Sequence, residues 1–231
     1  TTADNNTAHG YQAMRYNTTG SHNTASGFYA LRSNTTGTQN TAIGKESLRN
    51  NTTGYNNTAN GYHALYSNTT GYTNTASGYR SLYANTSGSR NTASGMYALT
   101  GNTTGTKNTA TGMYSLYLNT TASYNTASGY TALYLNTTGE RNTAHGYQAL
   151  RGTTTGTKNI GLGYGAGDAI TTGSNNTIIG DYAGTTTLAD TVVIAAGTTE
   201  RLKIDASGLS INGTALASGA TSINGLTDGY N

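Results

Sequence analysis

Polar and apolar residues recur along this chain with a period of 17 residues, which matches neither the 3.6-residue period of a helix nor the alternation of a long strand. The first nine units share the consensus N-T-A-x-G-Y-x-A-L-x-x-N-T-T-G-x-x, and the opening asparagine recurs eleven times without an insertion or deletion. A unit of this length is too short for a pair of helices, and its Gly, Thr and Asn residues are poor helix formers. Each unit is therefore predicted to form one coil of an all-β, parallel β-solenoid of about eleven coils.

Each coil is predicted to contain two extended segments and one turn. The motifs N-T-A-x-G and Y-x-A-L would be extended, and N-T-T-G would be the turn, with its glycine at positive φ. Because side chains alternate along a strand, the Ala and Gly of N-T-A-x-G should point inward and the variable x outward. Coils stacked about 4.8 Å apart would give a rod of roughly 50 Å with a very thin interior.

One leucine or methionine per coil is difficult to place in so thin an interior. Burying one such side chain is worth about 2 kcal/mol, so a row of nine should not remain in water. The row is therefore expected to face sister chains along a shared axis, which predicts self-association. Its members are Met14, Leu31, Leu48, Leu65, Leu82, Leu99, Leu116, Leu133 and Leu150.

The repeat changes character twice along the chain. Residues 1–158 form the regular array, residues 159–192 are Gly-rich and degenerate, as terminal repeats usually are, and residues 193–231 contain short strand-like segments around Gly turns. Residues 1–158 hold ten Lys/Arg and three Asp/Glu, a net charge of +7, whereas residues 159–231 hold two and six, a net charge of −4. We expect a solenoid with a tapered end, followed by a short non-repeating β segment.

Composition narrows the functional classes. Only 9% of the residues are charged, and Pro, Cys and Trp are absent. The lack of proline suits a continuous backbone hydrogen-bond ladder, and the lack of cysteine excludes disulfides, thiolate metal ligands and a cysteine nucleophile. No stretch approaches the roughly 18–20 consecutive apolar residues of a membrane helix, and no signal peptide opens the chain, so no membrane insertion is expected.

Candidate catalytic and metal-binding residues are scattered. The four histidines occupy three positions of the repeat, and the two that share one, His9 and His145, would lie about 38 Å apart. Asp168, Asp181 and Asp190 could supply oxygen ligands for Ca²⁺, but solvated loop acids explain them more simply. The basic charge is too thinly spread for nucleic-acid binding. The sequence therefore predicts no enzyme activity, no cofactor, no metal site and no nucleic-acid partner.

A row of arginines and tyrosines lies nine places after the repeat asparagines. Tyrosine combines a rigid contact area with a polar tip, and arginine can pair with a carboxylate or phosphate, so such a row would suit an acidic surface polysaccharide. The alternative is a stacked ladder that only stabilises the rod. The candidate glycan contacts are Arg15, Arg32, Arg49, Tyr66, Tyr83, Tyr117, Tyr134 and Arg151.

Two other rows have alternative interpretations. The asparagine of N-T-T-G opens a formal N-glycosylation sequon, although a turn whose asparagines hydrogen-bond from coil to coil is the simpler interpretation. The threonine of N-T-A forms a regular row, which makes ice binding a rival function, but a single row is narrow for that. The sequon asparagines are Asn17, Asn34, Asn51, Asn68, Asn85, Asn102, Asn119 and Asn136.

Two phrases carry a family resemblance. N-T-A-I-G-K-E-S-L at 40–48 and N-T-I-I-G-D-Y-A-G at 176–184 resemble the head repeats of trimeric autotransporter adhesins, the YadA-like left-handed parallel β-roll. The repeat array followed by A-D-T-V-V-I-A-A-G-T-T-E-R-L-K-I-D-A-S-G at 189–208 is still more similar to phage tail-fibre shafts, although the YadA head unit is shorter. The resemblance implies a trimeric, rigid, extracellular fibre on a virion tail or a bacterial surface.

Together these observations predict a non-enzymatic fibre shaft or adhesin that presents a surface for attachment to host cell-surface glycans. The alternative is a glycosylated extracellular filament without a specific ligand, and an ice-binding solenoid is a further rival. Self-association and polysaccharide binding are the two predicted interactions.

Overall fold

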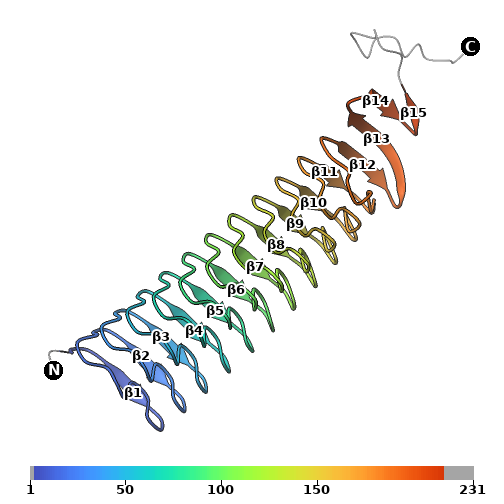
Figure 1. The fold of residues 1–231 in the computed structure, drawn as a ribbon. Helices are drawn as coiled ribbons and strands as arrows, with labels where there is room; N and C mark the ends of the chain where they lie inside the picture. Colours follow the sequence, from blue (N-terminus) through green and yellow to red (C-terminus); the bar gives the residue numbers. More distant parts are fainter. Residues whose placement is uncertain (1–2, 216–231) are drawn as a thin grey trace, which may run out of the picture.

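The strands of this chain form one continuous sheet along an elongated solenoid, seen from the side in Figure 1. The computed structural model describes residues 3–215, and their strand order in the sheet follows the sequence from β1 to β15. The predicted all-β, parallel β-solenoid is confirmed. The strands contributed by the repeat are β1 (Thr7–His9), β2 (Thr24–Ser26), β3 (Thr41–Ile43), β4 (Thr58–Asn60), β5 (Thr75–Ser77), β6 (Thr92–Ser94), β7 (Thr109–Thr111), β8 (Thr126–Ser128), β9 (Thr143–His145), β10 (Ile160–Leu162) and β11 (Thr177–Ile179).

Each coil pairs in parallel with the next, and the register places every residue over its equivalent 17 positions away. Thr58 pairs with Thr75, for example, and Ala59 with Ala76. The strand alanines from β2 to β9 are buried, Ala8 in the terminal strand β1 is exposed, and the variable residues that follow the alanines are exposed or half-buried. The predicted inward alanine and outward x are therefore confirmed.

The second predicted extended segment is wrong, because Y-x-A-L forms a turn. Two of its residues adopt left-handed conformations in each regular coil, as His63 (φ 57°) and Leu65 (φ 52°) do. Such a conformation costs an L-residue about 1–2 kcal/mol. It also aims the backbone N–H groups along the rod, so that the amide of Leu65 donates to the carbonyl oxygen of Ser81 in the next coil at 3.0 Å.

The glycine with positive φ is also a different one from that predicted. Gly61, which ends N-T-A-x-G, has a φ of 143°, whereas Gly71 of N-T-T-G does not have positive φ. Gly71 is needed for space instead, since an added Cβ would clash with Asn68 Oδ1 and with the carbonyl oxygen of Gly88.

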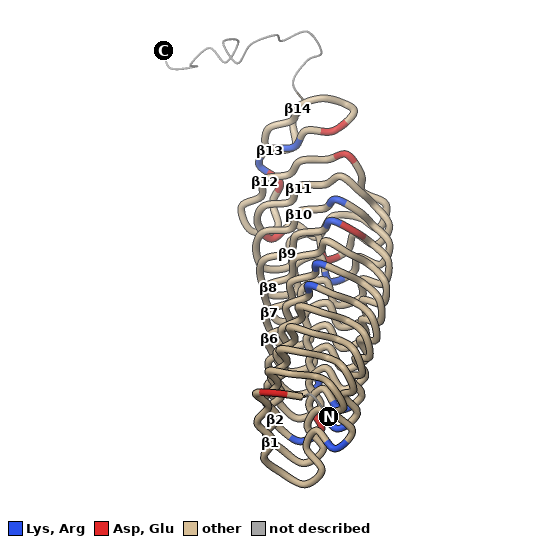
Figure 2. Tube along the Cα trace, turned by 90° about the vertical axis from the view of Figure 1, so that its left-hand side faces the viewer, with Lys and Arg blue, Asp and Glu red and all other residues tan. Residues whose placement is uncertain are grey.

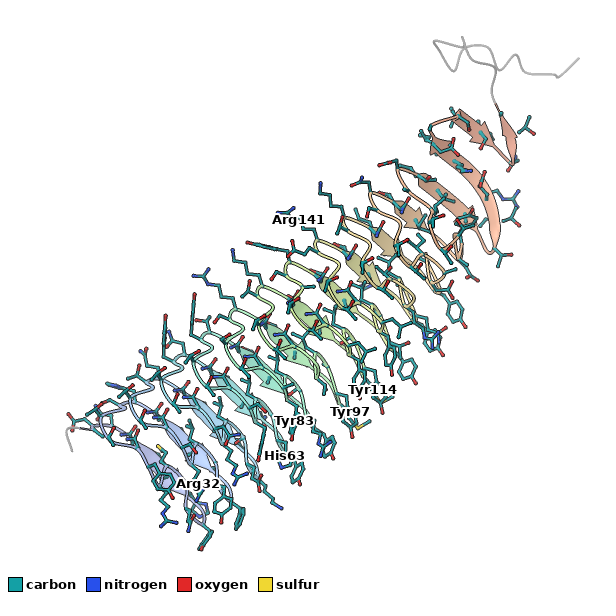
Figure 3. The ribbon with its side chains drawn as sticks, viewed as in Figure 1. Arg32, His63, Tyr83, Tyr97, Tyr114 and Arg141 are labelled. Atoms are coloured by element: carbon teal, nitrogen blue, oxygen red, sulfur yellow. The ribbon has the colours of Figure 1, made fainter. Side chains whose placement is uncertain are left out.

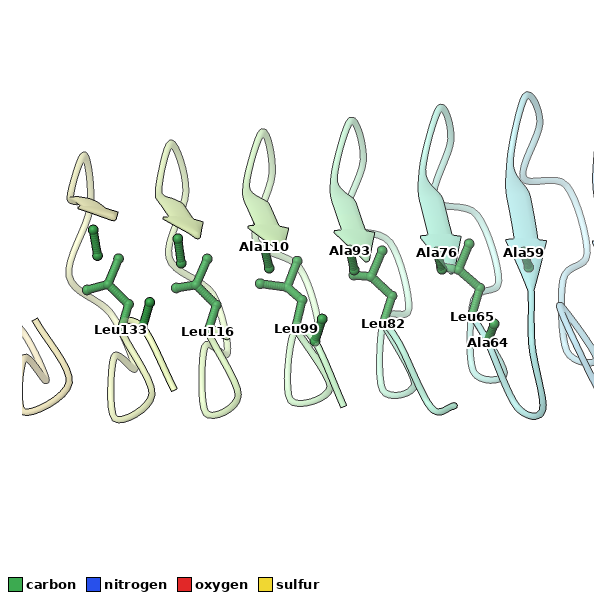
Figure 4. Close-up of a cluster of buried hydrophobic side chains, with 14 of the residues drawn as sticks. Ala59, Ala64, Leu65, Ala76, Leu82, Ala93, Leu99, Ala110, Leu116 and Leu133 are labelled. Carbon is green, nitrogen blue, oxygen red and sulfur yellow. The ribbon is translucent and has the colours of Figure 1, made fainter. Parts of the chain in front are cut away.

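The leucine row lies inside the single chain, so the prediction that it faces sister chains is wrong. Leu31, Leu48, Leu65, Leu82, Leu99, Leu116, Leu133 and Leu150 are 0% exposed, and Met14 is 8% exposed. Figure 4 shows successive leucines stacked one per coil beside the strand alanines. The physical reason is the left-handed turn, which directs the leucine inward, while small alanines on both sides leave room for one large side chain per coil.

Two ladders of buried asparagines hold the N-T-T-G turn. The side-chain amides of Asn57, which opens one repeat, and of Asn68, from N-T-T-G, both donate to the carbonyl oxygen of Gly71, at 2.8 and 3.0 Å. Asn68 Nδ2 also donates to Asn51 Oδ1 in the preceding coil at 2.8 Å, and the backbone amide of Asn57 donates to Asn40 Oδ1 at 3.0 Å. These bonds confirm the coil-to-coil interpretation of the asparagines.

The same ladder disfavours glycosylation of the folded rod at seven of these positions. A sugar would be attached to the amide nitrogen that donates both bonds, in a side chain without access to solvent. The N-glycosylation interpretation is therefore contradicted for the fully buried Asn34, Asn51, Asn68, Asn85, Asn102, Asn119 and Asn136, whereas Asn17 is half-buried and its glycosylation stays a prediction.

The parallel array extends one strand beyond the last 17-residue repeat. The eleventh coil is two residues shorter, so that β12 (Val192–Ala196) pairs in parallel with β11, Val192 opposite Thr177. β13 (Thr199–Asp205), β14 (Gly208–Ile211) and β15 (Thr214–Ala215) then continue the sheet as an antiparallel meander. The short strands predicted after residue 192 are present, and residues 216–231 of that segment lie outside the described residues.

The core is refilled where the leucine disappears from the repeat. Gly167 and Gly184 occupy the leucine position, and Ile170, which replaces an asparagine of the second ladder, is 0% exposed. A Cβ added to Gly167 would lie 2.7 Å from Leu150 Cδ2 and 3.2 Å from Ile170 Cδ1. The glycine is therefore needed because Leu150 and Ile170 already fill this space.

We expect Leu116→Ala to lower the free energy of unfolding by about 2–5 kcal/mol, because it leaves a cavity between alanines. Leu118 in the same coil is 38% exposed, so Leu118→Ala serves as the matched control with a much smaller loss. Urea unfolding measures both. Equal losses in the two variants would contradict the placement of the leucine row.

We expect Asn68→Ala to destabilise the rod by about 1–3 kcal/mol, because it leaves the buried Asn51 Oδ1 without its donor. Asn60 lies on the exposed side of β4, and Asn60→Ala should change stability by no more than about 0.5 kcal/mol. Thermal and urea unfolding compare the pair. A neutral Asn68→Ala would show that the ladder does not stabilise the coils.

Candidate functional site

The Y-x-A-L turn directs three rows of side chains outward along one edge of the rod. These rows lie five, six and nine places after the repeat asparagine, on either side of the buried Ala and Leu at places seven and eight. We call them the position-five, position-six and position-nine rows, and together the aromatic edge. Figure 3 labels Arg32, His63, Tyr83, Tyr97 and Tyr114 along this edge.

The candidate glycan contacts predicted from the sequence are the position-nine row. Arg15 and Arg151 are exposed, and Arg32, Arg49, Tyr66, Tyr83, Tyr117 and Tyr134 are half-buried. Neighbours in the row stack on one another: the ring centroids of Tyr66 and Tyr83, and of Tyr117 and Tyr134, are 5.2 Å apart. Such contacts stabilise the rod. Because the side chains are only half-buried or exposed, the same row also keeps surface in solvent that a glycan could contact.

The position-five and position-six rows were missed as candidate contacts. Tyr62 and Tyr79 stack at 5.4 Å in the position-five row, and Tyr97 and Tyr114 stack at 5.2 Å in the position-six row. The 17-residue period of the sequence was sufficient to identify these two rows. They were overlooked because an extended Y-x-A-L would place successive side chains on opposite faces, whereas the turn brings three rows to one edge.

The edge carries an excess of positive charge in coils three to five. Glu46 accepts from His63 at 3.1 Å and lies 3.6 Å from Arg49. Burial lowers the pKa of the His63 imidazole, although Glu46 opposes the shift, so His63 is mainly neutral at neutral pH. Lys45, Arg49 and Arg80 therefore outnumber the single carboxylate, which favours an anionic ligand.

A hollow of about 350 Å³ opens on the aromatic edge, lined by residues of coils seven to nine. Four tyrosines, one threonine and one arginine line it. They are Tyr114, Tyr117, Tyr130, Thr131, Tyr134 and Arg151.

A basic row occupies a different side of the rod. It lies sixteen places after the repeat asparagine and contains Arg90, Lys107, Arg141 and Lys158, all exposed, with Tyr124 between them. Lys107 Nζ donates to the Tyr124 hydroxyl at 3.1 Å. Figure 2 shows Lys and Arg following one another on successive coils, and Figure 3 places Arg141 away from the labelled tyrosines.

The outward face of the sheet changes from polar to apolar towards the C-terminal end. Over β2–β9 it carries the N-T-A threonines, most of them exposed, beside a row of mainly Ser, Thr, Asn and His. Over β10–β13 large apolar side chains take these positions, each 37–46% exposed. They are Ile160, Leu162, Ile179, Ile194 and Ile204.

The three carboxylates considered for Ca²⁺ do not form a common site. Asp190 accepts from Asn175 Nδ2 at 2.8 Å. Burial and the neighbouring charge of Asp181 raise the pKa of Asp168. Within residues 3–215, no group of three or more His, Cys, Asp or Glu side chains is placed to hold a metal ion. The same residues include no helix with the length and apolar character needed to cross a membrane.

Comparison of the chain with protein-family models, with curated proteins and with solved structures finds no match. The fold therefore rests on the structure alone. Function has to be inferred from the chemistry of the aromatic edge, the basic row and the outward sheet face.

Proposed function

We propose that this chain is a non-enzymatic fibre shaft or adhesin segment whose aromatic edge attaches to acidic cell-surface glycans. The observation that carries the proposal is the continuity of this edge, which presents tyrosine rings and guanidinium groups in nearly every coil from Tyr11 to Arg151. An extracellular site, on a virion tail or a cell surface, is where such a polymer would be encountered.

The chemistry of the edge matches an acidic polysaccharide. Tyrosine faces accept the apolar face of a sugar ring, their hydroxyls bond to its hydroxyls, and arginine pairs with a carboxylate through two parallel hydrogen bonds. The coils repeat about every 4.8 Å, so a polymer lying along the rod would meet equivalent groups many times. Individually weak contacts would then combine into a strong attachment.

Rigidity supports the same function. Each coil is fixed to the next by backbone hydrogen bonds and by the asparagine ladders, so the edge is ordered before any ligand arrives. Binding to a preorganised surface loses less conformational entropy than binding to mobile loops.

Self-association through the apolar end of the sheet face is the second part of the proposal. Because the leucine row is buried within one chain, it gives no reason to expect self-association. Leu162, Ile179 and Ile194, however, form an exposed apolar row where earlier coils carry mainly polar residues. Burying each such side chain against a sister chain would contribute about 1.5–3 kcal/mol. The trimer implied by the family resemblance would have this face at its axis.

One rival function is favoured by a specific observation. The N-T-A threonines are mostly exposed on a flat sheet face, as an ice-binding surface would require. The neighbouring outward row is interrupted by Ile43, Asn60 and His145, which disfavours a regular hydroxyl lattice. Measurable thermal hysteresis of freezing would support this rival over glycan attachment.

We expect the triple variant Arg49→Ser, Tyr66→Ser, Tyr83→Ser to weaken binding to polygalacturonate at least about tenfold, because it removes three adjacent contacts from the edge. The sheet-face variant Thr58→Ala, Thr75→Ala is the control, with unchanged affinity. Immobilised polysaccharide and surface plasmon resonance provide the measurement, with circular dichroism to confirm folding. Unchanged binding by the triple variant, or no binding by the wild type, would exclude attachment through this edge.

We expect native mass spectrometry to give a mass near three times the 23.8 kDa chain. Leu162→Ser combined with Ile179→Ser should shift the mass to that of one chain, because it removes apolar area from the proposed contact. Leu118→Ser, an exposed position in another part of the rod, should leave the trimer intact. A monomeric wild type would refute self-association without affecting glycan attachment.

A further inference from the structure

The position-six row mixes aromatic and non-aromatic side chains, and at one place a short side chain follows two stacked rings. Tyr97 and Tyr114 stack in this row at 5.2 Å with an angle of 4° between their planes, and the next member is Thr131. The rows on both sides are aromatic in this coil, with Tyr130 in the position-five row and Tyr134 in the position-nine row. The short threonine therefore lies between two tyrosines, directly after a stacked pair.

The hollow described above lies at this threonine. Its volume of about 350 Å³ falls at the small end of the range for ligand pockets. Tyr117 stacks on Tyr134 at 5.2 Å and meets Tyr114 edge to face at 5.4 Å, so the wall offers rings in two orientations. A flat ring of a ligand could occupy the position that a tyrosine occupies in the preceding coils.

One buried hydroxyl at the hollow has no hydrogen-bond partner within residues 3–215. Thr131 is only 7% exposed, and its hydroxyl has no hydrogen-bond partner among the described residues. This oxygen has less than 1 Å² of exposed surface, so a ligand hydroxyl could reach it only after rotation of the Thr131 side chain. Leaving a buried hydroxyl unpaired is unfavourable, and the bond formed after that rotation would remove the penalty. This combination of flat apolar walls and an unpaired hydroxyl is suited to a sugar ring more than to a purely apolar group.

Arg151 supplies the charge at this hollow. Its side chain is exposed, and within residues 3–215 its guanidinium makes neither a hydrogen bond to a side chain nor a salt bridge. Asp168 follows it in the position-nine row, one coil further on, without forming an ion pair with it. The guanidinium is therefore available for a carboxylate presented by a ligand in the hollow.

We propose that this hollow is a subsite for one acidic pyranose ring of the attached polysaccharide, with Tyr114, Tyr117 and Tyr134 around the ring, Thr131 bonding to a hydroxyl and Arg151 pairing with the carboxylate. The inference rests on the proposed glycan attachment and makes it specific. It assigns recognition of a sugar ring to the coil in which Thr131 follows Tyr97 and Tyr114.

Thr131→Tyr tests the inference because it extends the Tyr97 and Tyr114 stack by one ring, which would fill the hollow. We expect it to lower the affinity for a galacturonate hexamer at least about tenfold by isothermal titration calorimetry, with an undiminished thermal midpoint. Thr138→Tyr adds the same side chain to the exposed turn of the same coil and should bind like the wild type. Equal binding by Thr131→Tyr and the wild type would overturn the subsite.

Arg151→Gln tests the charge at a solvent-exposed position where folding is not at risk. It should reduce binding of the galacturonate hexamer about tenfold and leave maltohexaose, a neutral hexamer, unaffected. Asp168→Asn should strengthen binding of the acidic hexamer, since it removes a nearby negative charge. Equal affinity of the wild type for the two hexamers would overturn the assignment to an acidic ring.

The results also separate the subsite from the wider proposal. If the wild type binds polygalacturonate and the Arg49, Tyr66 and Tyr83 variant does not, glycan attachment holds whatever Thr131→Tyr does. If the wild type binds neither the polymer nor the hexamer, attachment and subsite fail together.

Discussion

Hydrogen bonding from each coil to the next is the interaction on which the rest of this structure depends. Backbone amides in the strands and in the left-handed turns donate to the neighbouring coil, and asparagine side chains complete the array at the corner where the backbone leaves carbonyl groups unpaired. The array uses the backbone N–H group at most positions of each coil, and the absence of proline accords with this. The first ten coils keep one length and so keep equivalent residues opposite one another, and β12 still pairs in register with β11 across a coil that is two residues shorter.

The turns combine a narrow interior with an outward-facing aromatic edge. Alanine rows leave space for one large side chain per coil, and the left-handed residues around it direct leucine inward and tyrosine or arginine outward. The conformational cost of these turns recurs in every coil, as do the buried leucine and the asparagine bonds that offset it. Stability is thus distributed along the rod, as expected when each repeat contacts only its neighbours.

Residues that follow the consensus form the solenoid, and residues that depart from it make the surface differ from one coil to another. Thr131 follows the stacked Tyr97 and Tyr114 and lines the hollow, while Leu162 and Ile179 turn a polar sheet face into an apolar one. At the end of the array, Ile170 replaces an asparagine and refills a core that has lost its leucine. Each coil contributes one residue to each row, so a single substitution alters the surface of one coil and leaves the other coils as they are.

The sequence alone determined which residues stack on one another. The 17-residue period identified the coils, the inward alanine, the outward variable residue and the asparagine ladders, because parallel pairing places equivalent residues in register. It did not determine the path of the chain within a coil. The sign of φ at positions such as His63 and Leu65 depends on bonds to neighbouring coils, and that sign placed the leucines inside and brought the position-five and position-six rows beside the position-nine row. The shortened eleventh coil was likewise decided by tertiary contacts, since β12 pairs with β11 after the period itself has ended.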